Sequence, residues 1–410
     1  MAGPPSPVLH RALRILLHLG CHGEDFARFG GPHDMTRITA DWLRGPAQQI
    51  CTMLENAGHQ AWFVGGCVRN ALLGLPVSDL DLCTDAQPTR VMALAKAAGL
   101  KAIPTGIDHG TVTVVADGVP FEITTFRRDV ATDGRRAKVA FAKTMIEDAR
   151  RRDFTMNALY CDALGEVTDP LDGLPDLHAR RVRFIENADR RIKEDYLRIL
   201  RFFRFHAWYG DPDAGIDADG LAACAENIDG LAQLSRERVT SEILKLLAAP
   251  DPALALASMS ASGVLGQVLP GAAPQVTAVL VHVEGQAGLA PDPIRRLVAL
   301  GGMRDGLRLT RNQEKRIVQL HDMQSLAASA YRYGADVAID RAAIDAASIG
   351  QDIDPNAIKS ALFAAAQTFP IQAADLMPDL QGAALGASLR KAEEDWIASG
   401  FTLTKVDLLG

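Results

Sequence analysis

The sequence predicts an α/β region followed by an all-helical region, and three observations support this division. Up to about Gly210, short β-rich runs alternate with helix-like segments. Within that part, Asp117-Gly118 lies between two β-rich runs, which is a strong signal for a β-hairpin and therefore for a sheet. From 211 to 410, Ala and Leu dominate, and Pro or Gly interrupts the chain at roughly the length of one helix.

The α/β region can be followed element by element. A short apolar run ends at Gly65-Gly66 and is followed by a helix-like segment that stops at Gly74. Leu80 and Leu82 alternate with acidic residues, which has the period of a strand. The remaining elements expected here are a helix over 88–99 and two hairpin strands over 111–115 and 120–126.

Composition excludes several classes of protein. The 410 residues are 48% hydrophobic and 23% charged, which excludes a disordered or collagen-like chain. No apolar run has the roughly 20 residues that a membrane span needs, so we expect no membrane association. A net charge of −7 excludes a surface that is basic overall. None of the six cysteines lies in a CxxC pair, which favours reduced thiols and a cytoplasmic location.

The first 34 residues form a separate question. The stretch 7–19 is basic and apolar, but it lacks the long apolar core and the cleavage site of a secretory signal. A better-formed amphipathic sequence follows Met35. We interpret residues 1–34 as an upstream extension, consistent with a misplaced start codon, and a transit peptide is the alternative.

Asp79-Leu80-Asp81 is the strongest local feature. On a strand, residues i and i+2 face the same side, and two neighbouring carboxylates repel each other unless a cation lies between them. Oxygen ligands of this kind suit Mg²⁺. The alternative is a solvated strand end.

Three further residues strengthen a metal-nucleotide interpretation. Gly66 lies where a strand turns into a helix, so its backbone N–H can approach a phosphate, and Arg69 lies one turn further on. The alternative for Gly65-Gly66 is an ordinary tight turn. Glu122, on the strand after the hairpin turn, could supply a third carboxylate, or could simply be an outward-facing strand residue.

The segment Arg150–Leu159 is predicted to open an amphipathic helix. Arg152 could contact phosphate, whereas Asp153 and Asn157, four residues apart on one face, could hold ribose hydroxyls. The alternative is a solvated basic helix face.

The segment Glu194–Phe205 places Asp195, Arg198, Arg201 and Arg204 at every third position. A surface ion pair between Asp195 and Arg198 is the simplest interpretation. However, arginines among large apolar residues are expected to be partly buried and to need anionic partners. An adjacent carboxylate and guanidinium can also select a base, because cytosine and adenine both present an amine next to a ring acceptor.

As a set, these segments resemble the tRNA nucleotidyltransferase/poly(A) polymerase family. The similar segments are GGCVRNALLGLPVSDLDLCTDAQP, GIDHGTVTVV, FEITTFRRD, RRDFTMNALY and EDYLRILRFFRF, within about residues 61–208. The resemblance implies a palm-like nucleotidyltransferase head, as in polymerase β, followed by a helical neck, body and tail. We therefore expect an extension over 1–34, a head over 35–185, a neck over 186–250, and a tRNA-binding body and tail over 251–410.

The resemblance also assigns roles to residues. By the resemblance, Asp79 and Asp81 hold the catalytic Mg²⁺, and Asp195 and Arg198 act as a protein template for C and A. Glu122, which the resemblance does not assign, remains a candidate third carboxylate from its place on the strand. The remaining nucleotide-binding positions are Gly65, Gly66, Arg69, Arg152, Asp153, Arg201 and Arg204. One departure is Asn70, where the family usually has Asp.

The activity that the resemblance implies is addition of C and A from CTP and ATP to the 3′ end of tRNA, without an obligate protein partner. Poly(A) synthesis, or addition of only part of CCA, are the alternatives within the family. Residues Arg127–Glu147 resemble the flexible loop of enzymes that add the whole CCA. An inactive RNA-binding paralogue is the alternative from another class, against which the intact Asp79 and Asp81 argue.

Overall fold

The computed structural model describes residues 36–133, 136–377 and 379–409. The expected extension over 1–34 therefore lies outside the described residues. The chain divides into two compact units. The amino-terminal unit holds the described residues up to Glu242 and also Leu254–Val268, and the carboxy-terminal unit holds Ile243–Ala253 and Leu269–Gly410. Each unit is considered separately.

A mixed seven-stranded sheet is the centre of the amino-terminal unit, as the α/β prediction requires. Its strand order is β3-β4-β5-β2-β1-β8-β9. The pair β2–β5 is parallel and the other neighbouring pairs are antiparallel. In chain order the strands are β1 (Trp62–Val64), β2 (Asp81–Thr84), β3 (Lys101–Gly106), β4 (Thr111–Ala116), β5 (Val119–Thr125), β8 (Tyr160–Cys161) and β9 (Val167–Thr168).

The predicted hairpin at Asp117-Gly118 is confirmed. Strands β4 and β5 pair from Thr111↔Thr124 to Ala116↔Val119, and both turn residues have positive φ, 48° and 80°. A two-residue turn of this kind matches the right-handed twist of the strands, and Asp-Gly adopts it readily. The turn thereby fixes which residues of β5 face each side of the sheet.

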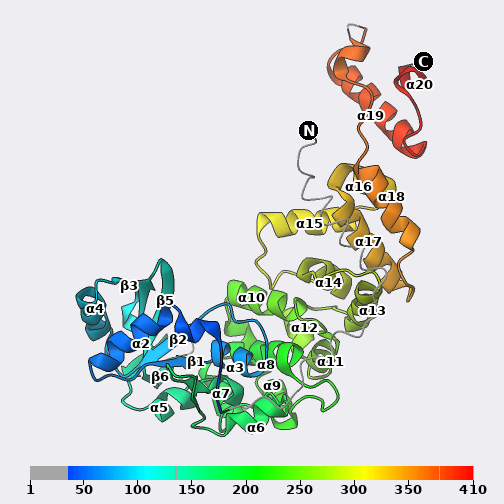
Figure 1. The fold of residues 1–410 in the computed structure, drawn as a ribbon. Coiled ribbons are helices and arrows are strands. Elements are labelled where there is room, and N and C mark those ends of the chain that lie inside the picture. The colour runs from blue at the N-terminus through cyan, green and yellow to red at the C-terminus, as the bar shows by residue number, and fades with distance from the viewer. Residues whose placement is uncertain (1–35, 134–135, 378, 410) are drawn as a thin grey trace. The chain divides into compact units, whose positions relative to one another are not determined.

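Helices α2 (Ala47–Asn56) and α4 (Pro88–Ala97) contact each other and strand β4, and α4 also contacts β3 (Figure 1). Their buried apolar residues include Ile50, Leu54 and Val91. Strand β5 alternates accordingly, with Phe121 and Ile123 buried and the intervening residue 122 exposed. The sheet thus has a covered face and a face on which polar side chains stay accessible.

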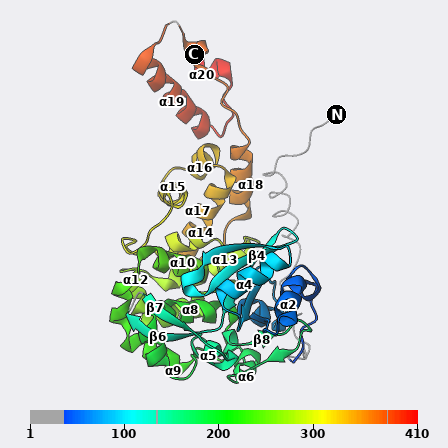
Figure 2. The ribbon, with the colours of Figure 1, turned by 90° about the vertical axis from the view of Figure 1, so that its left-hand side faces the viewer.

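Two strands lie outside the main sheet. The pair β6 (Arg127–Asp133) and β7 (Arg136–Phe141) forms an antiparallel ribbon, seen side by side in Figure 2. This ribbon occupies most of the segment that resembles the flexible loop. It leads into α5 (Met145–Arg150), whose first turn is closed by a capping box between Thr144 and Glu147.

The prediction of a helix over 150–159 is wrong. Helix α5 ends at Arg150, and the chain continues through bends into the 3-10 turn η4 (Thr155–Asn157). The cause is Phe154, whose backbone is extended and forms a bridge with Phe184. Asp153 accepts a hydrogen bond from the Phe154 N–H at 2.9 Å, which occupies a backbone group that a continuing helix would use.

The rest of the amino-terminal unit is largely helical and packs around an aromatic cluster. Rings of Phe154, Phe184, Phe202 and Phe205 have centroids 4.9–6.3 Å apart. The elements not yet named are η2 (Asp41–Arg44), α3 (Gly66–Leu72), η3 (Ile107–His109), α6 (Gly173–His178), α7 (Ala188–Glu194), α8 (Leu197–Tyr209), α9 (Ala218–Glu226), η5 (Ile228–Gln233), α11 (Ala253–Ala261) and α12 (Val264–Val268), while α10 (Arg236–Leu247) contains the boundary between the units.

Every regular element in the described residues of the carboxy-terminal unit is a helix, as predicted from its Ala- and Leu-rich composition. Trp396 and Ile397 anchor an apolar cluster with Ala328 near the end of the chain. Among the described residues, no helix has both the length and the apolar character needed to cross a bilayer. The helices are α13 (Pro274–Gln286), α14 (Pro293–Leu300), α15 (Arg311–His321), α16 (Leu326–Tyr333), α17 (Ala335–Ser348), α18 (Pro355–Ala365), η6 (Ala373–Leu376), α19 (Gly382–Ala398) and α20 (Lys405–Leu409).

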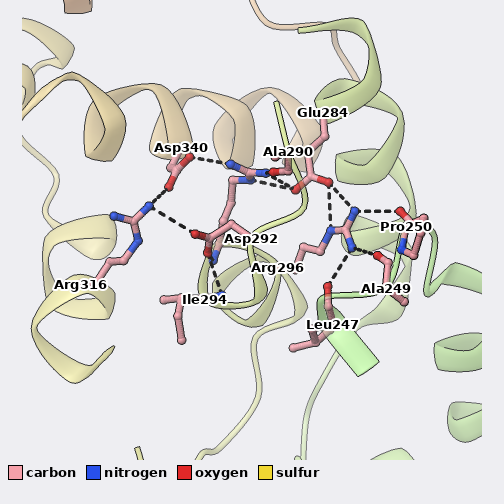
Figure 3. Close-up of polar contacts among 11 residues, drawn as sticks. Leu247, Ala249, Pro250, Glu284, Ala290, Asp292, Ile294, Arg296, Arg316 and Asp340 are labelled. Carbon is pink, nitrogen blue, oxygen red and sulfur yellow. Dashed lines mark hydrogen bonds and ion pairs between the residues drawn. The ribbon is translucent and has the colours of Figure 1, made fainter. Parts of the chain in front are cut away.

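A buried ionic network connects helices of this unit (Figure 3). Glu284 on α13 accepts from both Arg295 and Arg296 on α14, and Arg295 continues to Asp340 on α17 at 2.6 Å. Arg296, only 1% exposed, also donates to the carbonyls of Leu247 at 2.8 Å, of Ala249, and of Pro250 at 3.0 Å. These carbonyls belong to the last residue of α10 and to two residues just after it, so a charged side chain satisfies groups that the helix end leaves bare.

Candidate active site

The turn between β1 and α3 forms one edge of the site. Helix α3 begins at Gly66, and Gly65 before it has φ 75° and ψ −118°. A β-carbon at position 65 would lie 3.3 Å from the Arg152 guanidinium and 3.8 Å from the Asn157 carbonyl. Glycine is therefore required by the backbone conformation and by the close approach of these groups. The predicted strand-to-helix turn is confirmed.

Two of the three predicted carboxylates are direct neighbours in the sheet. Asp81 is the first residue of β2 and is in register with Glu122 on β5, and both are exposed. Asp79 lies in the segment before β2 rather than on the strand, contrary to the prediction for this pair. Continuing the parallel register by two residues would place Asp79 opposite Pro120, which has no N–H to donate to the ladder.

The environment of Asp81 shows that these carboxylates interact. Partial burial raises the pKa of Asp81, the charges of Glu122 and Asp79 raise it further, and Arg152 acts in the opposite direction. Asp79, Asp81 and Glu122 all line a cleft of about 740 Å³. Within the described residues, no group of three or more His, Cys, Asp or Glu side chains is arranged to hold a metal by itself. Mg²⁺ commonly takes one or two carboxylates and completes its shell with water and substrate phosphates, so the residues present fit such an ion.

Arg152 acts on Asp81 through its charge and is bound by residues of the protein interior. Its guanidinium donates to Asp148 at 3.0 Å and lies over the ring of Tyr160. Asp148 is fully buried and also accepts from Arg151 at 2.8 Å and from the Tyr160 hydroxyl at 3.0 Å. Since two guanidinium groups share this carboxylate, their positions are fixed relative to each other.

Asp153 and Asn157 come together although no helix joins them. The Asn157 amide donates to Asp153 Oδ1 at 2.9 Å, and Arg201 on α8 donates to Asp153 Oδ2 at 2.7 Å. Burial alone would raise the pKa of Asp153, but the charge of Arg201 and the hydrogen bonds from Asn157 and Arg201 lower it to about 2. The segment predicted to contact ribose is thereby attached to α8.

Arg69 is more buried than the sequence suggested. It is 6% exposed and donates to Asn157 Oδ1 at 2.5 Å and to the Tyr209 hydroxyl at 2.8 Å. Asn70, the departure from the family pattern, accepts from Arg69 at 3.1 and 2.8 Å and donates to the Pro76 carbonyl at 2.8 Å. Asn70 therefore joins Arg69 to the segment that leads to Asp79.

The arginines of α8 are partly buried and have acidic partners, as expected. Arg201 pairs with Asp153, Arg204 with Glu242 at 2.5 Å, and Arg198 with Glu194 at 2.8 Å.

Asp195 differs from the prediction. It precedes α8 and pairs with Arg238 at 2.7 Å rather than with Arg198. Its Oδ1 accepts from the Leu197 N–H, which turns the side chain back along the start of the helix.

Several residues of this site were missed from the sequence. Asp148 precedes Arg151 and Arg152 at helical spacing, a signal that could have identified it. Glu194 begins the segment Glu194–Phe205, but no partner was predicted for it from the sequence. Tyr209, Arg238 and Glu242 carry no local signal, because their partners lie 38 or more positions away in the chain.

Comparison with known proteins agrees with this architecture. Residues 61–183 match the model of the poly A polymerase head domain, and residues 215–276 match the probable RNA and SrmB-binding site of polymerase A. Over 386 residues, the chain is 31% identical to the mitochondrial CCA tRNA nucleotidyltransferase 1 of Mus musculus, covering 88% of each protein. This chain belongs to the tRNA nucleotidyltransferase/poly(A) polymerase family.

Other members of the family are also similar. The CCA-adding enzyme of Geobacillus thermodenitrificans is 41% identical over 236 residues, which span 56% of each protein. The structure of the Bacillus stearothermophilus CCA-adding enzyme in complex with CTP aligns with a TM-score of 0.66 and 26% identity, covering 86% of this chain and 92% of that one. The fold predicted from the sequence, a nucleotidyltransferase head followed by helices, is thus confirmed. Nucleotidyltransferases of this family generally use a divalent metal ion.

Proposed function

We propose that this protein adds C and A nucleotides to the 3′ end of tRNA by metal-dependent transfer from CTP and ATP, without a nucleic-acid template. The observation that carries the proposal is the register pair Asp81–Glu122, with Asp79 in the same cleft and with Arg152 near the Gly65 turn and acting on Asp81 through its charge. This arrangement suits in-line transfer from a nucleoside triphosphate.

The relatives support CCA addition within the family. Their names describe CCA-adding enzymes, and the mouse protein, a CCA tRNA nucleotidyltransferase, aligns along most of its length. The Bacillus stearothermophilus enzyme was crystallised with CTP. The β6–β7 ribbon, in the segment resembling the flexible loop, favours addition of the whole CCA over partial addition.

Asp79 and Asp81 are the residues that would hold the metal, with Glu122 beside them, and Mg²⁺ is the proposed ion. When bound, the ion would lower the pKa of the 3′-hydroxyl that attacks the α-phosphate and would stabilise the charge on the leaving pyrophosphate. The raised pKa of Asp81 supports this assignment, because carboxylates that repel each other gain from a cation between them. Oxygen-only ligands favour Mg²⁺ over softer metals.

The remaining head residues would bind and orient the nucleotide. The backbone N–H of Gly66 would face the triphosphate, with Arg69 and Arg152 supplying positive charge behind it. Gly65, whose own N–H donates to the Leu159 carbonyl at 3.2 Å, would contribute by letting the phosphates come close to the turn. Asp153 would accept from a ribose hydroxyl, because its ionised form is stabilised by Arg201.

Asp195 and Arg198 would select the base, and Arg201 and Arg204 would support the nucleotide from the same helix. In the structure Asp195 is bound by Arg238, and Arg198 by Glu194. A cytosine or adenine would have to replace these contacts, its amine donating to Asp195 and its ring acceptor receiving from Arg198. A guanine or uracil would leave both protein groups unsatisfied, which is the basis of the proposed discrimination.

The helical residues are the proposed tRNA-binding part. We retain the proposed division into a head over 35–185, a neck over 186–250 and a body and tail over 251–410. The cytoplasm is the proposed location, which the five free and buried thiols of the described chain support. No obligate protein partner is proposed.

The test is incorporation of each of the four nucleotides into tRNA that lacks its 3′ CCA, with the products sequenced. The wild type should add C, C and A with Mg²⁺ present and stop. Asp79→Asn and Asp81→Asn should abolish all incorporation but still bind tRNA, whereas Asp345→Asn, an exposed carboxylate on α17, should behave as wild type.

Each alternative has its own outcome. Long A tails would indicate a poly(A) polymerase, and products that stop at CC or begin only from CC would indicate a partial activity. A wild type that binds tRNA without incorporation would indicate an inactive paralogue. Substantial incorporation by either aspartate variant would remove that residue from the metal site.

A further inference from the structure

The buried guanidinium of Arg69 is held by uncharged groups. Its hydrogen-bond acceptors are the amide oxygens of Asn70 and Asn157 and the hydroxyl of Tyr209. Four of its five N–H groups are used in these contacts. Arg69 can therefore offer at most one N–H to a phosphate without giving up a protein contact, so holding helices in place is the larger part of what its side chain does.

Tyr209 contacts Arg69 in two ways. Its hydroxyl accepts from the Arg69 guanidinium at 2.8 Å, and the guanidinium carbon lies 3.9 Å from the centre of its ring. The ring of Phe205, one turn earlier on α8, lies 5.1 Å from the same carbon. The phosphate-turn helix α3 thus packs, through Arg69, on the last turn of α8.

A second connection joins the same two helices. Arg69 donates to Asn157, Asn157 donates to Asp153, and Asp153 accepts from Arg201 on α8. Helix α8 is therefore attached to α3 at Arg201 and again at Tyr209, about two turns apart. Tyr209 thereby attaches the last turn of α8 to α3, in addition to the Arg204–Glu242 pair and the buried aromatic residues that hold the rest of the helix.

We propose that Tyr209 is a positioning residue that, through Arg69, fixes the orientation of α8 relative to the phosphate turn, so that nucleotide discrimination depends on its hydroxyl. The inference rests on the proposed selection of bases by Arg198, which lies on α8 on the other side of Arg201 from Tyr209. Discrimination requires donors and acceptors held in register with the base edge, and even a small displacement of α8 would disturb that register.

The experiment compares Tyr209→Phe and Tyr209→Leu with the wild type. Phe keeps the ring beneath Arg69 and removes only the hydroxyl, whereas Leu removes both. The matched control is Tyr333→Phe, since Tyr333 also uses its hydroxyl in a side-chain hydrogen bond, to Asp322, but on helix α16. For each protein we would measure kcat and KM for CTP, ATP, UTP and GTP, the Kd of CTP and UTP, and the urea unfolding midpoint.

The expected result is a roughly three- to tenfold loss of CTP-over-UTP discrimination in Tyr209→Phe. This is less than a whole hydrogen bond from a charged guanidinium is worth, because only part of the displacement of α8 reaches the base edge. Tyr209→Leu should lose more, and Tyr333→Phe should lose none. The urea unfolding midpoint of Tyr209→Phe should fall no further than that of Tyr333→Phe, which also loses a hydroxyl hydrogen bond, and this comparison separates positioning from general destabilisation.

Two outcomes would overturn the proposal. One is an equal loss for all four nucleotides in both Tyr209 variants, which would make the contact structural. The other is unchanged discrimination in both. If the wild type bound CTP selectively but transferred nothing, the proposed function would fail, and Tyr209 would still be judged by the ratio of the two Kd values.

Discussion

Replacing Asp148 by Asn removes one negative charge from the centre of the head. This carboxylate is fully buried and accepts hydrogen bonds from Arg151, Arg152 and the Tyr160 hydroxyl at 2.8–3.0 Å. Burial alone would raise the pKa of Asp148, but the charges of Arg152 and Arg151 outweigh burial and lower the pKa to about 2. The Asn variant keeps the shape of the side chain and removes the charge that both arginines share.

The pKa gives the size of the expected effect. A carboxyl whose pKa falls from 3.8 to about 2 on folding stabilises the folded state by about 2.5 kcal/mol at neutral pH. Because the folded pKa is the lower one, this stability is fully present above pH 3.8 and is lost as the pH falls through about 2. Asp148→Asn should therefore lower the free energy of unfolding by about 2.5 kcal/mol at pH 7 and by progressively less toward pH 2.

Urea unfolding at pH 7, 5 and 3, followed by circular dichroism, would measure this difference. Asp345→Asn, which changes an exposed carboxylate, is the control and should shift stability by less than about 0.5 kcal/mol. An Asp148→Asn protein as stable as the wild type at pH 7 would refute the reasoning. A penalty that stayed constant between pH 7 and pH 3 would equally show that the charge is not its source.

Three further predictions concern base choice, the phosphate turn and the helical unit. Asp195→Ala and Arg198→Ala should each lower discrimination against UTP and GTP by about tenfold or more in incorporation assays, with slow transfer remaining; an equal loss for all four nucleotides would contradict base selection by this pair. Gly65→Ala should cost about 1–3 kcal/mol of stability, because the backbone of residue 65 lies at φ 75° and the new methyl group would meet Arg152. The variant should also lower incorporation of CTP and ATP alike. A fully active and stable variant would show that the turn adapts. Glu284→Gln should lower the thermal unfolding midpoint of the carboxy-terminal unit by an amount equivalent to about 3–5 kcal/mol, since Arg295 and Arg296 would lose a buried counter-charge. An unchanged midpoint would contradict this prediction.

Local signals predicted the fold well where the chain itself enforces the geometry. The Asp117-Gly118 turn, the start of α3 at Gly66 and the helical texture beyond Gly210 all depend on neighbouring residues, and the structure confirms them. The helix expected over 150–159 failed because Phe154 pairs with Phe184, a contact between distant residues that overrides local periodicity.

The same difference between local signals and contacts of distant residues applies to the candidate site. That Asp81 and Glu122 both lie next to or on strands could be anticipated from local alternation, whereas their closeness comes from the parallel pairing of β2 with β5. The partner of Asp195 could not be anticipated either. Arg238 lies 43 residues further along the chain and is brought to Asp195 only by the packing of helices. The burial of Arg69 was likewise invisible, because Tyr209 lies 140 residues away.

The Arg296 side chain has no unused hydrogen-bond donor. All five of its N–H groups are used, two on Glu284 and three on the carbonyls of Leu247, Ala249 and Pro250 (Figure 3). A lysine at this position would bring three N–H groups for four acceptor atoms and would leave at least one of them bare. A single substitution at position 296 is therefore expected to destabilise the fold. A replacement that keeps stability has to change Glu284 and the path of the chain after α10 together with Arg296.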